Sequence, residues 1–428
     1  MRQRLLAVLV LLLAGSLAFA AGTEEQAAAD ETTIRIIWWG SQTRHDLTLE
    51  TTELFEEKNP EVTVEPEFLG WGGYWERLAT QAAGGELPDV IQTAIASGFG
   101  TNYADRGLLA DLDPLIEQGL INVDDVEVST LAPNVIDGKL YGIPLGVNAP
   151  TIAYDPQAFE EAGVDMPELG WTWDDFLSMG SAYNDATGNY FIGFSNPAQE
   201  FFTYYLRTQG YSFLGDDGLS LGYPDDQLLV EFWSMMLEMQ EQGVLAPPDV
   251  ASQHTALENR LLSLQRAATT FIYSNQLDAI TQAAGRPIEL AIMPGPNTED
   301  GMFLKPSMDF AIASNSEAIE TAAAFVDFFT NDLDANRILR GERGVPISAA
   351  VRQDLAERSN DVQRKVFGYI DLVSANSSPM DQAHPVFQEA MNRLFEIEQE
   401  VLYERAEPAE AAARFRREAE QIFERAAE

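Results

Sequence analysis

Alternating strand and helix patterns near the N-terminus constrain the fold of this chain more than any other feature. Apolar, β-branched runs predict strands, and apolar positions at helical spacing predict helices between them. The predicted strands are residues 33–38, 62–68 and 90–93, and the predicted helices are residues 44–58 and 71–83. Strands that alternate with helices are typical of a parallel sheet with crossover helices. The sequence therefore predicts an α/β fold.

The length of the chain predicts a second lobe, because 428 residues exceed the usual size of one compact domain. Hydrophobic residues make up 46% of the sequence, which is enough for two cores. Further strands are predicted at residues 151–154, 267–273, 288–293 and 309–314, and further helices at residues 155–162, 173–179, 257–265 and 317–329. Residues 343–348 are expected to form an extended crossing, and the remainder of the chain is expected to be helical.

The N-terminal residues 1–20 have the composition of a secretory signal peptide. Arg2 and Arg4 precede the apolar run Leu5–Leu13, and small residues surround the expected cleavage point. A membrane anchor is the alternative, but the apolar run is short for a bilayer span. Residues 21–31 are expected to be an unstructured polar leader. Because the sequence has no cysteine, we expect no lipid anchor and a mature protein that is free in the periplasm.

The chain is strongly acidic, with 68 Asp and Glu residues against 26 Lys and Arg residues and a formal net charge of −42. Nucleic acids and anionic membranes are recognised by basic patches. The charge balance therefore argues against both as partners. The acidic residues are scattered along the chain, which is typical of a hydrated surface.

Enzyme motifs are missing from the sequence. It has three histidines and no cysteine, and no histidine belongs to a HExxH pattern. There is also no P-loop and no GxSxG motif, so we predict no catalytic residue, no metal site and no cofactor. A glycosidase needs only two positioned carboxylates, so a secreted glycosidase or lyase stays as an alternative.

Several segments, in their order and spacing, carry a family resemblance. They are IRIIWWGSQTRHDLTLETTELFEEKNPEVTVEPEF (Ile34–Phe68), YWERLATQAAGGELPDVIQT (Tyr74–Thr93), GLLADLDPLI (Gly107–Ile116), GKLYGIPLGVNAPTIAYDPQAFEEAGV (Gly138–Val164), TWDDF (Thr172–Phe176) and FAIASNSEAIETAAAFVDFFTN (Phe310–Asn331). Together they resemble the extracellular solute-binding proteins of ABC importers, in the sugar-binding family that includes maltose-binding protein. The resemblance covers essentially the whole mature chain.

The resemblance implies a two-lobed periplasmic-binding-protein fold, with parallel-type sheets flanked by helices and a hinge between the lobes. It places lobe one at residues 32–147 and 305–342, and lobe two at residues 148–304 and 343–428. Such a protein closes around its ligand as a hinge. The expected hinges are the crossings near Gly146–Pro150, Lys305 and Arg343–Pro346. The implied partners are a small carbohydrate and the transmembrane permease subunits, and the implied state is a monomer.

Carbohydrate capture requires aromatic rings for the apolar sugar faces and planar polar groups for the hydroxyls. In open parallel sheets, ligands bind beyond the carboxyl ends of the strands. Residues that follow strands or crossings are therefore candidates, and the loop after the third strand adds Phe99 and Asn102. The candidate binding residues are Trp39, Gln42, Arg44, Trp71, Tyr74, Tyr103, Asn148, Trp233, Tyr273, Asn275 and Arg343.

Each aromatic candidate has a core alternative. Strand alternation sends only one of Trp38 and Trp39 towards the cleft, and Trp39 is favoured. Trp71 and Tyr74 lie among glycines, which favours ligand contact, whereas Trp75 is expected in the core. Trp233 lies on an apolar helix, which fits core and cleft equally.

The sequence leaves the class of ligand open. A neutral oligosaccharide needs only aromatic and amide groups, whereas a uronate needs a cationic clamp. Arg44, Arg207 and Arg343 are the clamp candidates, although Arg44 also fits a solvated role and Arg343 also fits an ion pair within the hinge. An anionic solute such as glycerol phosphate is the alternative ligand.

Overall fold

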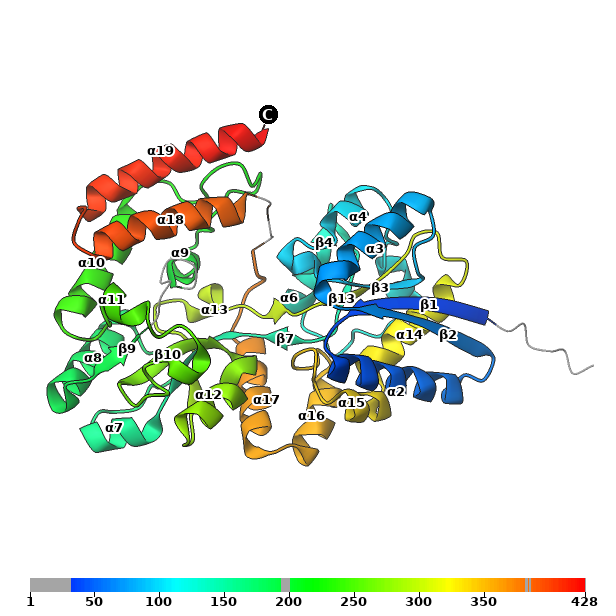
Figure 1. The fold of residues 1–428 in the computed structure, drawn as a ribbon, viewed down its shortest axis with the longest axis horizontal. Coiled ribbons are helices and arrows are strands. Elements are labelled where there is room, and N and C mark those ends of the chain that lie inside the picture. The colour runs from blue at the N-terminus through cyan, green and yellow to red at the C-terminus, as the bar shows by residue number, and fades with distance from the viewer. Residues whose placement is uncertain (1–31, 194–200, 382–383, 385, 428) are drawn as a thin grey trace, which may run out of the picture.

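The chain folds into two lobes that lie next to each other (Figure 1). The computed structural model describes all residues except 1–31, 194–200, 382–383, 385 and 428. The signal peptide and leader predicted for residues 1–31 lie outside the described residues. Each lobe contains a sheet with helices on its faces, so the predicted two-lobed α/β fold is confirmed. Among the described helices, none is long and apolar enough to cross a membrane.

The sheet of the first lobe has the strand order β2-β1-β3-β13-β6. Its strands are β1 (Thr32–Trp39), β2 (Val62–Leu69), β3 (Val90–Thr93), β6 (Ile143–Pro144) and β13 (Asp309–Ile312). β1 pairs in parallel with both β2 and β3, as the sequence predicts. β13 runs antiparallel to β3 and β6, so the sheet as a whole is mixed.

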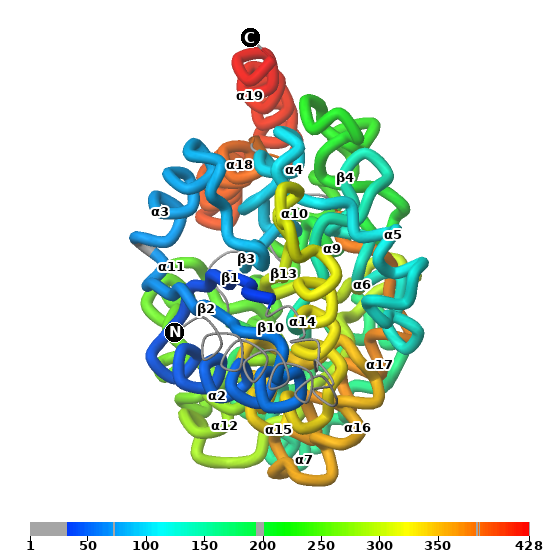
Figure 2. The backbone as a smooth tube through the Cα atoms, turned by 90° about the vertical axis from the view of Figure 1, so that its right-hand side faces the viewer, coloured from blue at the N-terminus to red at the C-terminus, as the bar shows by residue number. Residues whose placement is uncertain are grey.

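Helices cover both faces of this sheet. They are α2 (Gln42–Lys58), α3 (Trp71–Gly84), α14 (Ile319–Asn331) and α15 (Leu333–Leu339). Figure 2 shows α3 on one side of β1 and β2, and α2 on the other. α2 begins behind Ser41, whose hydroxyl accepts a hydrogen bond from the Arg44 amide, and α3 ends at Gly85 in the left-handed conformation.

Strand alternation in β1 separates the two faces of the first lobe. Ile36 and Trp38 belong to the core beneath α2, whereas Ile37 and Trp39 belong to the core beneath α3. Trp38 also donates from Nε1 to Nδ1 of His45 at 3.1 Å, which fixes it inside the lobe. The predicted division of Trp38 and Trp39 between opposite faces therefore holds.

The sheet of the second lobe has the order β11-β8-β10-β9 and is also mixed. Its strands are β8 (Pro150–Tyr154), β9 (Tyr190–Ile192), β10 (Ala267–Tyr273) and β11 (Glu289–Ala291). β9 runs parallel to β10, and β8 runs antiparallel to β10 and β11. The sequence predicts β8, β10 and β11 within one or two residues but misses the short strand β9.

The remaining described elements complete the two lobes. Around the first sheet lie α4 (Thr101–Asp105), α5 (Asp113–Glu117), α6 (Val128–Leu131), β4 (Val135–Ile136) and β5 (Lys139–Leu140). The helices of the rest of the chain are α7 (Pro156–Ala162), α8 (Trp173–Thr187), α9 (Thr203–Thr208), α10 (Gln227–Glu241), α11 (Pro248–Ala251), α12 (Leu277–Ala284), α13 (Thr298–Gly301), α16 (Ala349–Arg358), α17 (Asp361–Ser374), α18 (Phe387–Leu402) and α19 (Pro408–Ala427).

One predicted helix is wrong. Residues 257–265 form only a 3-10 turn at Leu257–Asn259, followed by further turns. Gln265 has a positive φ of 58°, and the Ser263 hydroxyl donates to the Leu257 carbonyl, so local side-chain bonding replaces the helical ladder.

Three crossings of the chain run side by side between the lobes. β7 (Val147–Asn148) pairs antiparallel with β12 (Lys305–Pro306), and Val147 exchanges backbone hydrogen bonds of 2.8 and 3.0 Å with Val345. These are the three crossings expected from the sequence. They form a narrow ribbon, named here the hinge ribbon, which consists of Gly146–Asn148, Lys305–Ser307 and Arg343–Val345.

The lobe boundaries predicted from the sequence stay a proposal, and the helices after residue 343 contact both lobes. The first sheet uses strands from residues 32–147 and 305–342, and the second uses strands from residues 148–304, as the proposed division requires. However, α16 packs against α15 of the first lobe as well as against α17. α17 in turn contacts the second lobe, because the Tyr369 hydroxyl donates to the Pro150 carbonyl at 2.7 Å.

Gly146→Ala should destabilise the protein by forcing the hinge ribbon apart. A methyl group at Gly146 would lie 2.8 Å from the Arg343 carbonyl oxygen and from backbone carbon atoms of Gly344. Such overpacking against backbone costs about 1–3 kcal/mol. We expect a loss of this size in the free energy of unfolding, measured by urea denaturation.

The matched control is Gly368→Ala, on the exposed side of α17. Nothing lies within 4 Å of a methyl group there, so the better helix propensity of alanine should raise stability by about 0.5–1 kcal/mol. Equal stability changes in the two variants would contradict close packing at Gly146.

Candidate functional site

A cavity of about 540 Å³ opens between the two lobes. The first lobe contributes Ala96 and Ser97, which follow β3, and the second lobe and the crossings contribute the remaining wall. That wall carries several aromatic rings and charged or polar side chains. It consists of Thr203, Arg207, Ser212, Phe213, Leu214, Gly215, Asp216, Tyr273, Phe303, Lys305, Met380, Asp381, His384, Phe387 and Gln388.

A cluster of aromatic rings, named here the aromatic platform, lies at the carboxyl ends of β1, β2 and β3. It consists of Trp39, Trp71, Tyr74, Trp75 and Phe99. Trp71 and Phe99 are 46% and 44% exposed, and their ring centroids are 5.0 Å apart in an edge-to-face arrangement. Trp75 stacks on Phe99 at 5.5 Å, and Trp39 supports Trp71 from below at 5.1 Å. The platform therefore presents two exposed rings on a buried aromatic base.

The sequence places these rings together for a topological reason. β1, β2 and β3 are parallel, so their carboxyl ends meet at one edge of the sheet. Phe99 lies on the loop after β3, which is closed by backbone hydrogen bonds of 2.8 and 3.0 Å between Ala94 and Phe99. Ser97 of the same loop lines the cavity, whereas the platform rings themselves are not part of its lining.

The aromatic candidates divide between surface and support. Trp71 is exposed, as predicted, whereas Trp39 is only 7% exposed and Tyr74 is fully buried. The Tyr74 hydroxyl donates to the Gln92 carbonyl at 2.5 Å, and burial raises the Tyr74 pKa well above its usual value. Trp75, expected in the core, is half-buried within the platform. Phe99, which the sequence adds from the loop after the third strand, is the exposed partner of Trp71.

Trp233 and Tyr103 do not reach the cavity. Trp233 is fully buried on α10, and its Nε1 donates to a carboxylate oxygen of Glu398 on α18 at 3.2 Å. The core alternative is therefore correct for Trp233. Tyr103 is 5% exposed and packs in the core beneath α3, where burial raises its pKa.

The candidates near the crossings have mixed outcomes. Tyr273 lines the cavity, with the Lys305 ammonium 5.0 Å from its ring centroid. Asn148 is half-buried on β7, and its side-chain oxygen is buried with no hydrogen-bond partner among the described residues. Asn275 is exposed just after β10. Gln42 is exposed and donates to Asp46 at 2.7 Å.

The arginines proposed as a uronate clamp are held by internal partners, which argues against that role. Arg44 pairs with Glu342 at 2.7 Å, and Arg343 is 4% exposed and donates to Gln92 at 3.0 Å. Neither lines the cavity. Burial, with the like charge of Arg44, lowers the pKa of Arg343 to about 9.

Arg207 does line the cavity, but its guanidinium is also occupied. It pairs with Asp381, and it donates to the Ser378 hydroxyl at 2.6 Å and to the Gly301 carbonyl at 3.1 Å. These bonds fasten the segment before α18 to α9. Arg207 therefore shapes the cavity wall.

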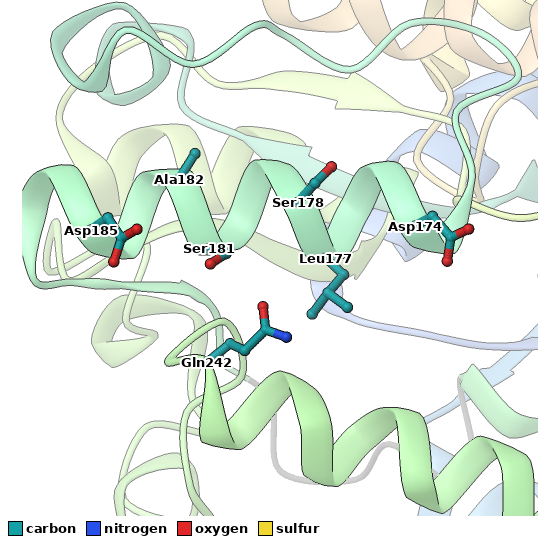
Figure 3. Close-up of a pocket in the computed structure, with 7 residues that line it drawn as sticks. All are labelled: Asp174, Leu177, Ser178, Ser181, Ala182, Asp185 and Gln242. Carbon is teal, nitrogen blue, oxygen red and sulfur yellow. The ribbon is translucent and has the colours of Figure 1, made fainter.

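A second depression runs along α8 and the end of α10 (Figure 3). Its lining contains no aromatic ring. It consists of Asp174, Leu177, Ser178, Ser181, Ala182, Asp185 and Gln242. It therefore lacks the stacking surface that a sugar requires. No group of His, Cys, Asp or Glu side chains suited to a metal ion occurs within the described residues.

A buried carboxyl group supports the loop that lines the cavity. Asp309, at the start of β13, is fully buried and accepts hydrogen bonds from the Ile95 amide at 2.8 Å and from the Asn134 side chain at 2.6 Å. Ile95 begins the 3-10 turn Ile95–Ser97. Burial raises the pKa of Asp309 from 3.8 to about 6, because the two hydrogen bonds offset desolvation only in part.

Asp309 should make stability depend on pH. Its folded pKa is raised, so the folded protein binds this proton more tightly than the unfolded chain. The resulting stability is complete below the unfolded value of 3.8 and is lost as the pH rises through about 6. The free energy of unfolding, relative to that of Asp309→Asn, should therefore fall by roughly 2 kcal/mol between pH 4 and pH 7. Urea denaturation across this range tests the expectation, with the surface variant Asp278→Asn as control. A constant difference would contradict it.

The fold and the site define a class: two α/β lobes on a hinge ribbon, with a cavity between them, form a periplasmic-type binding protein. The family profile described as bacterial extracellular solute-binding protein matches residues 41–333. The chain therefore belongs to the family of bacterial extracellular solute-binding proteins.

Individual relatives are distant. A putative binding protein of Brucella abortus (strain 2308) is 28% identical over 180 residues, which are 40% of this chain and 41% of that protein. An arabinooligosaccharide-binding protein of Halalkalibacterium halodurans is 25% identical over 177 residues, 40% of this chain and 38% of that protein. The chain thus matches about two-fifths of the length of these curated relatives.

Solved structures match over nearly the whole chain. A family 1 extracellular solute-binding protein from Alicyclobacillus acidocaldarius is 25% identical, with a TM-score of 0.83, and the match covers 92% of this chain and 98% of that one. A periplasmic oligogalacturonide-binding protein from Yersinia enterocolitica has a TM-score of 0.79 at 23% identity, covering 93% and 100% of the two chains. The latter similarity concerns the fold alone.

Proposed function

We propose that this protein captures a carbohydrate, in the form of an oligosaccharide, between its lobes and delivers it to the membrane permease of an ABC importer. The observation that carries the proposal is the aromatic platform, whose exposed ring Phe99 lies on the same loop as the cavity-lining residue Ser97 and contacts the exposed ring of Trp71. Exposed rings on a rigid aromatic base fit the apolar face of a sugar. The protein acts in the periplasm as a monomer in this proposal.

The polar part of the cavity supports the same ligand class. Sugar hydroxyls pair with polar groups, and the cavity wall offers Gln388, Asp216 and Ser212. The name of the arabinooligosaccharide-binding relative agrees with this chemistry. A cavity of about 540 Å³ fits the volume range of small-ligand pockets.

A neutral sugar is the favoured ligand. Arg44 and Arg343 pair inside the protein, and Arg207 is held by Asp381, which argues against all three candidates for a uronate clamp. Lys305 is the remaining lysine or arginine of the cavity wall, where it lies over Tyr273.

Calorimetric titration of the mature protein with neutral oligosaccharides, uronate-containing oligosaccharides and glycerol 3-phosphate distinguishes the ligand classes. Saturable binding of glycerol 3-phosphate alone would falsify the proposal.

Trp71→Ala should weaken binding of the carbohydrate by about tenfold or more, because a stacked ring contributes on the order of 1–2 kcal/mol. Phe99→Ala should have a similar effect. The dissociation constant from calorimetry is the measurement, and thermal denaturation shows that each variant is folded.

The matched control is Tyr403→Ala. Tyr403 is 39% exposed at the end of α18, away from the cavity, so its removal deletes an equally exposed ring. Its dissociation constant should match that of the natural protein. If all three variants bind equally well, the platform is not the sugar surface.

A further inference from the structure

A buried hydrogen-bond network joins the hinge ribbon to the aromatic platform. Arg343, in the third crossing, donates from Nε to the side-chain oxygen of Gln92 at 3.0 Å. Gln92 lies on β3, is fully buried, and donates from its side-chain nitrogen to the carbonyl of Trp39 at 3.1 Å. The backbone carbonyl of Gln92 accepts the hydroxyl of Tyr74 at 2.5 Å. One buried glutamine therefore contacts the hinge on one side and two platform residues on the other.

A second route reaches the same platform atom. Arg44 donates from Nη1 to the Trp39 carbonyl at 3.3 Å, and its Nε donates to Glu342 at 2.7 Å. Glu342 immediately precedes Arg343 in the chain. The Trp39 carbonyl thus accepts from two donors, and each donor is bonded to a residue at the third crossing.

Arg343 is fastened to the first lobe by more than this bond. Its Nη2 donates to the Thr48 hydroxyl at 2.9 Å, and its guanidinium carbon lies 5.1 Å from the Phe329 ring centroid. Its backbone carbonyl accepts the hydroxyl of Ser307 from the second crossing. The same residue therefore bonds both to a neighbouring crossing and, through Gln92, to the platform.

We propose that Gln92 and Arg343 are positioning residues that couple the hinge ribbon to the aromatic platform, so that the position of the third crossing sets the orientation of Trp39. A buried amide with both ends bonded has one satisfied orientation. A shift of Arg343 therefore moves Gln92 or leaves a buried polar group unpaired. Through this link, lobe closure adjusts the base of the platform, and a ring stacked on the platform favours one hinge position.

The proposed coupling depends on the proposed function in one respect, which is that the platform is the surface that binds the ligand. The link itself consists of hydrogen bonds within the protein. It is therefore tested without any sugar, so a failure of the coupling is distinguishable from a failure of carbohydrate binding.

The experiment uses the mature protein labelled with 5-fluorotryptophan and observed by ¹⁹F NMR. The sequence contains seven tryptophans, and single Trp→Phe variants assign their resonances. Arg343→Lys keeps the charge but loses the fork of donors that holds Gln92 and Thr48 together. Although Arg343 contacts no platform ring in the network described above, the variant should shift the Trp39 resonance.

The matched control is Arg352→Lys. Arg352 is equally buried and donates to the carbonyls of Pro346 and Ile347, just beyond the same crossing, but it has no bond to Gln92. Its substitution should leave the Trp39 resonance in place. Equal Trp39 shifts in the Arg343 and Arg352 variants, or no shift in either, overturn the coupling.

Gln92→Glu tests the residue that joins Arg343 to Trp39. It is the second variant, used if Arg343→Lys does not fold. The carboxylate keeps an acceptor for Arg343 but loses the donor to the Trp39 carbonyl. The Trp39 resonance should shift, while Gln81→Glu, which changes a buried glutamine on α3, should leave it unchanged. If a carbohydrate ligand is known, Gln92→Glu should also weaken its binding about tenfold. An unmoved Trp39 resonance in Gln92→Glu overturns the proposal, whatever the ligand.

Discussion

The parallel pairing of β1 with β2 and β3 is the constraint on which the rest of this structure depends. It brings three carboxyl ends to one edge of the first sheet, and an aromatic residue lies at or after each end. Trp39 is the last residue of β1, Trp71 is the first residue of α3 after β2, and Phe99 lies in the loop after β3. The platform is therefore a consequence of strand direction, and its rings support one another because they share that edge.

The return of the chain through the hinge ribbon is the second constraint. Three crossings lie so close that Gly146 has no room for a side chain against Arg343 and Gly344. Hydrogen bonds to Gln92 and Thr48, a ring contact with Phe329 and the nearby carboxylate of Glu342 offset the desolvation of the buried Arg343 guanidinium. The hinge is thus tied into the first lobe at the level of the platform.

The acidic composition explains why the arginines expected in the cleft serve the fold. In a chain with 68 acidic and 26 basic residues, carboxylate partners are abundant within the protein. Arg44 pairs with Glu342, and Arg207 pairs with Asp381 at the cavity wall. Both arginines position other segments of the chain. The exposed rings of the platform, Trp71 and Phe99, are uncharged.

The sequence by itself determined the strands β1, β3 and β10 and the opposite directions of Trp38 and Trp39, because local periodicity and strand alternation are encoded in neighbouring residues. The two-lobed arrangement followed from the chain length and the family resemblance. Only the tertiary structure decided that Trp233 is bonded to Glu398 in a core, that Arg343 is bonded to Gln92, and that residues 257–265 form turns instead of a helix. The two side-chain partnerships join residues 165 and 251 positions apart, respectively, and no local pattern reports such contacts. Which side of a helix or crossing meets the cavity is therefore fixed by long-range packing.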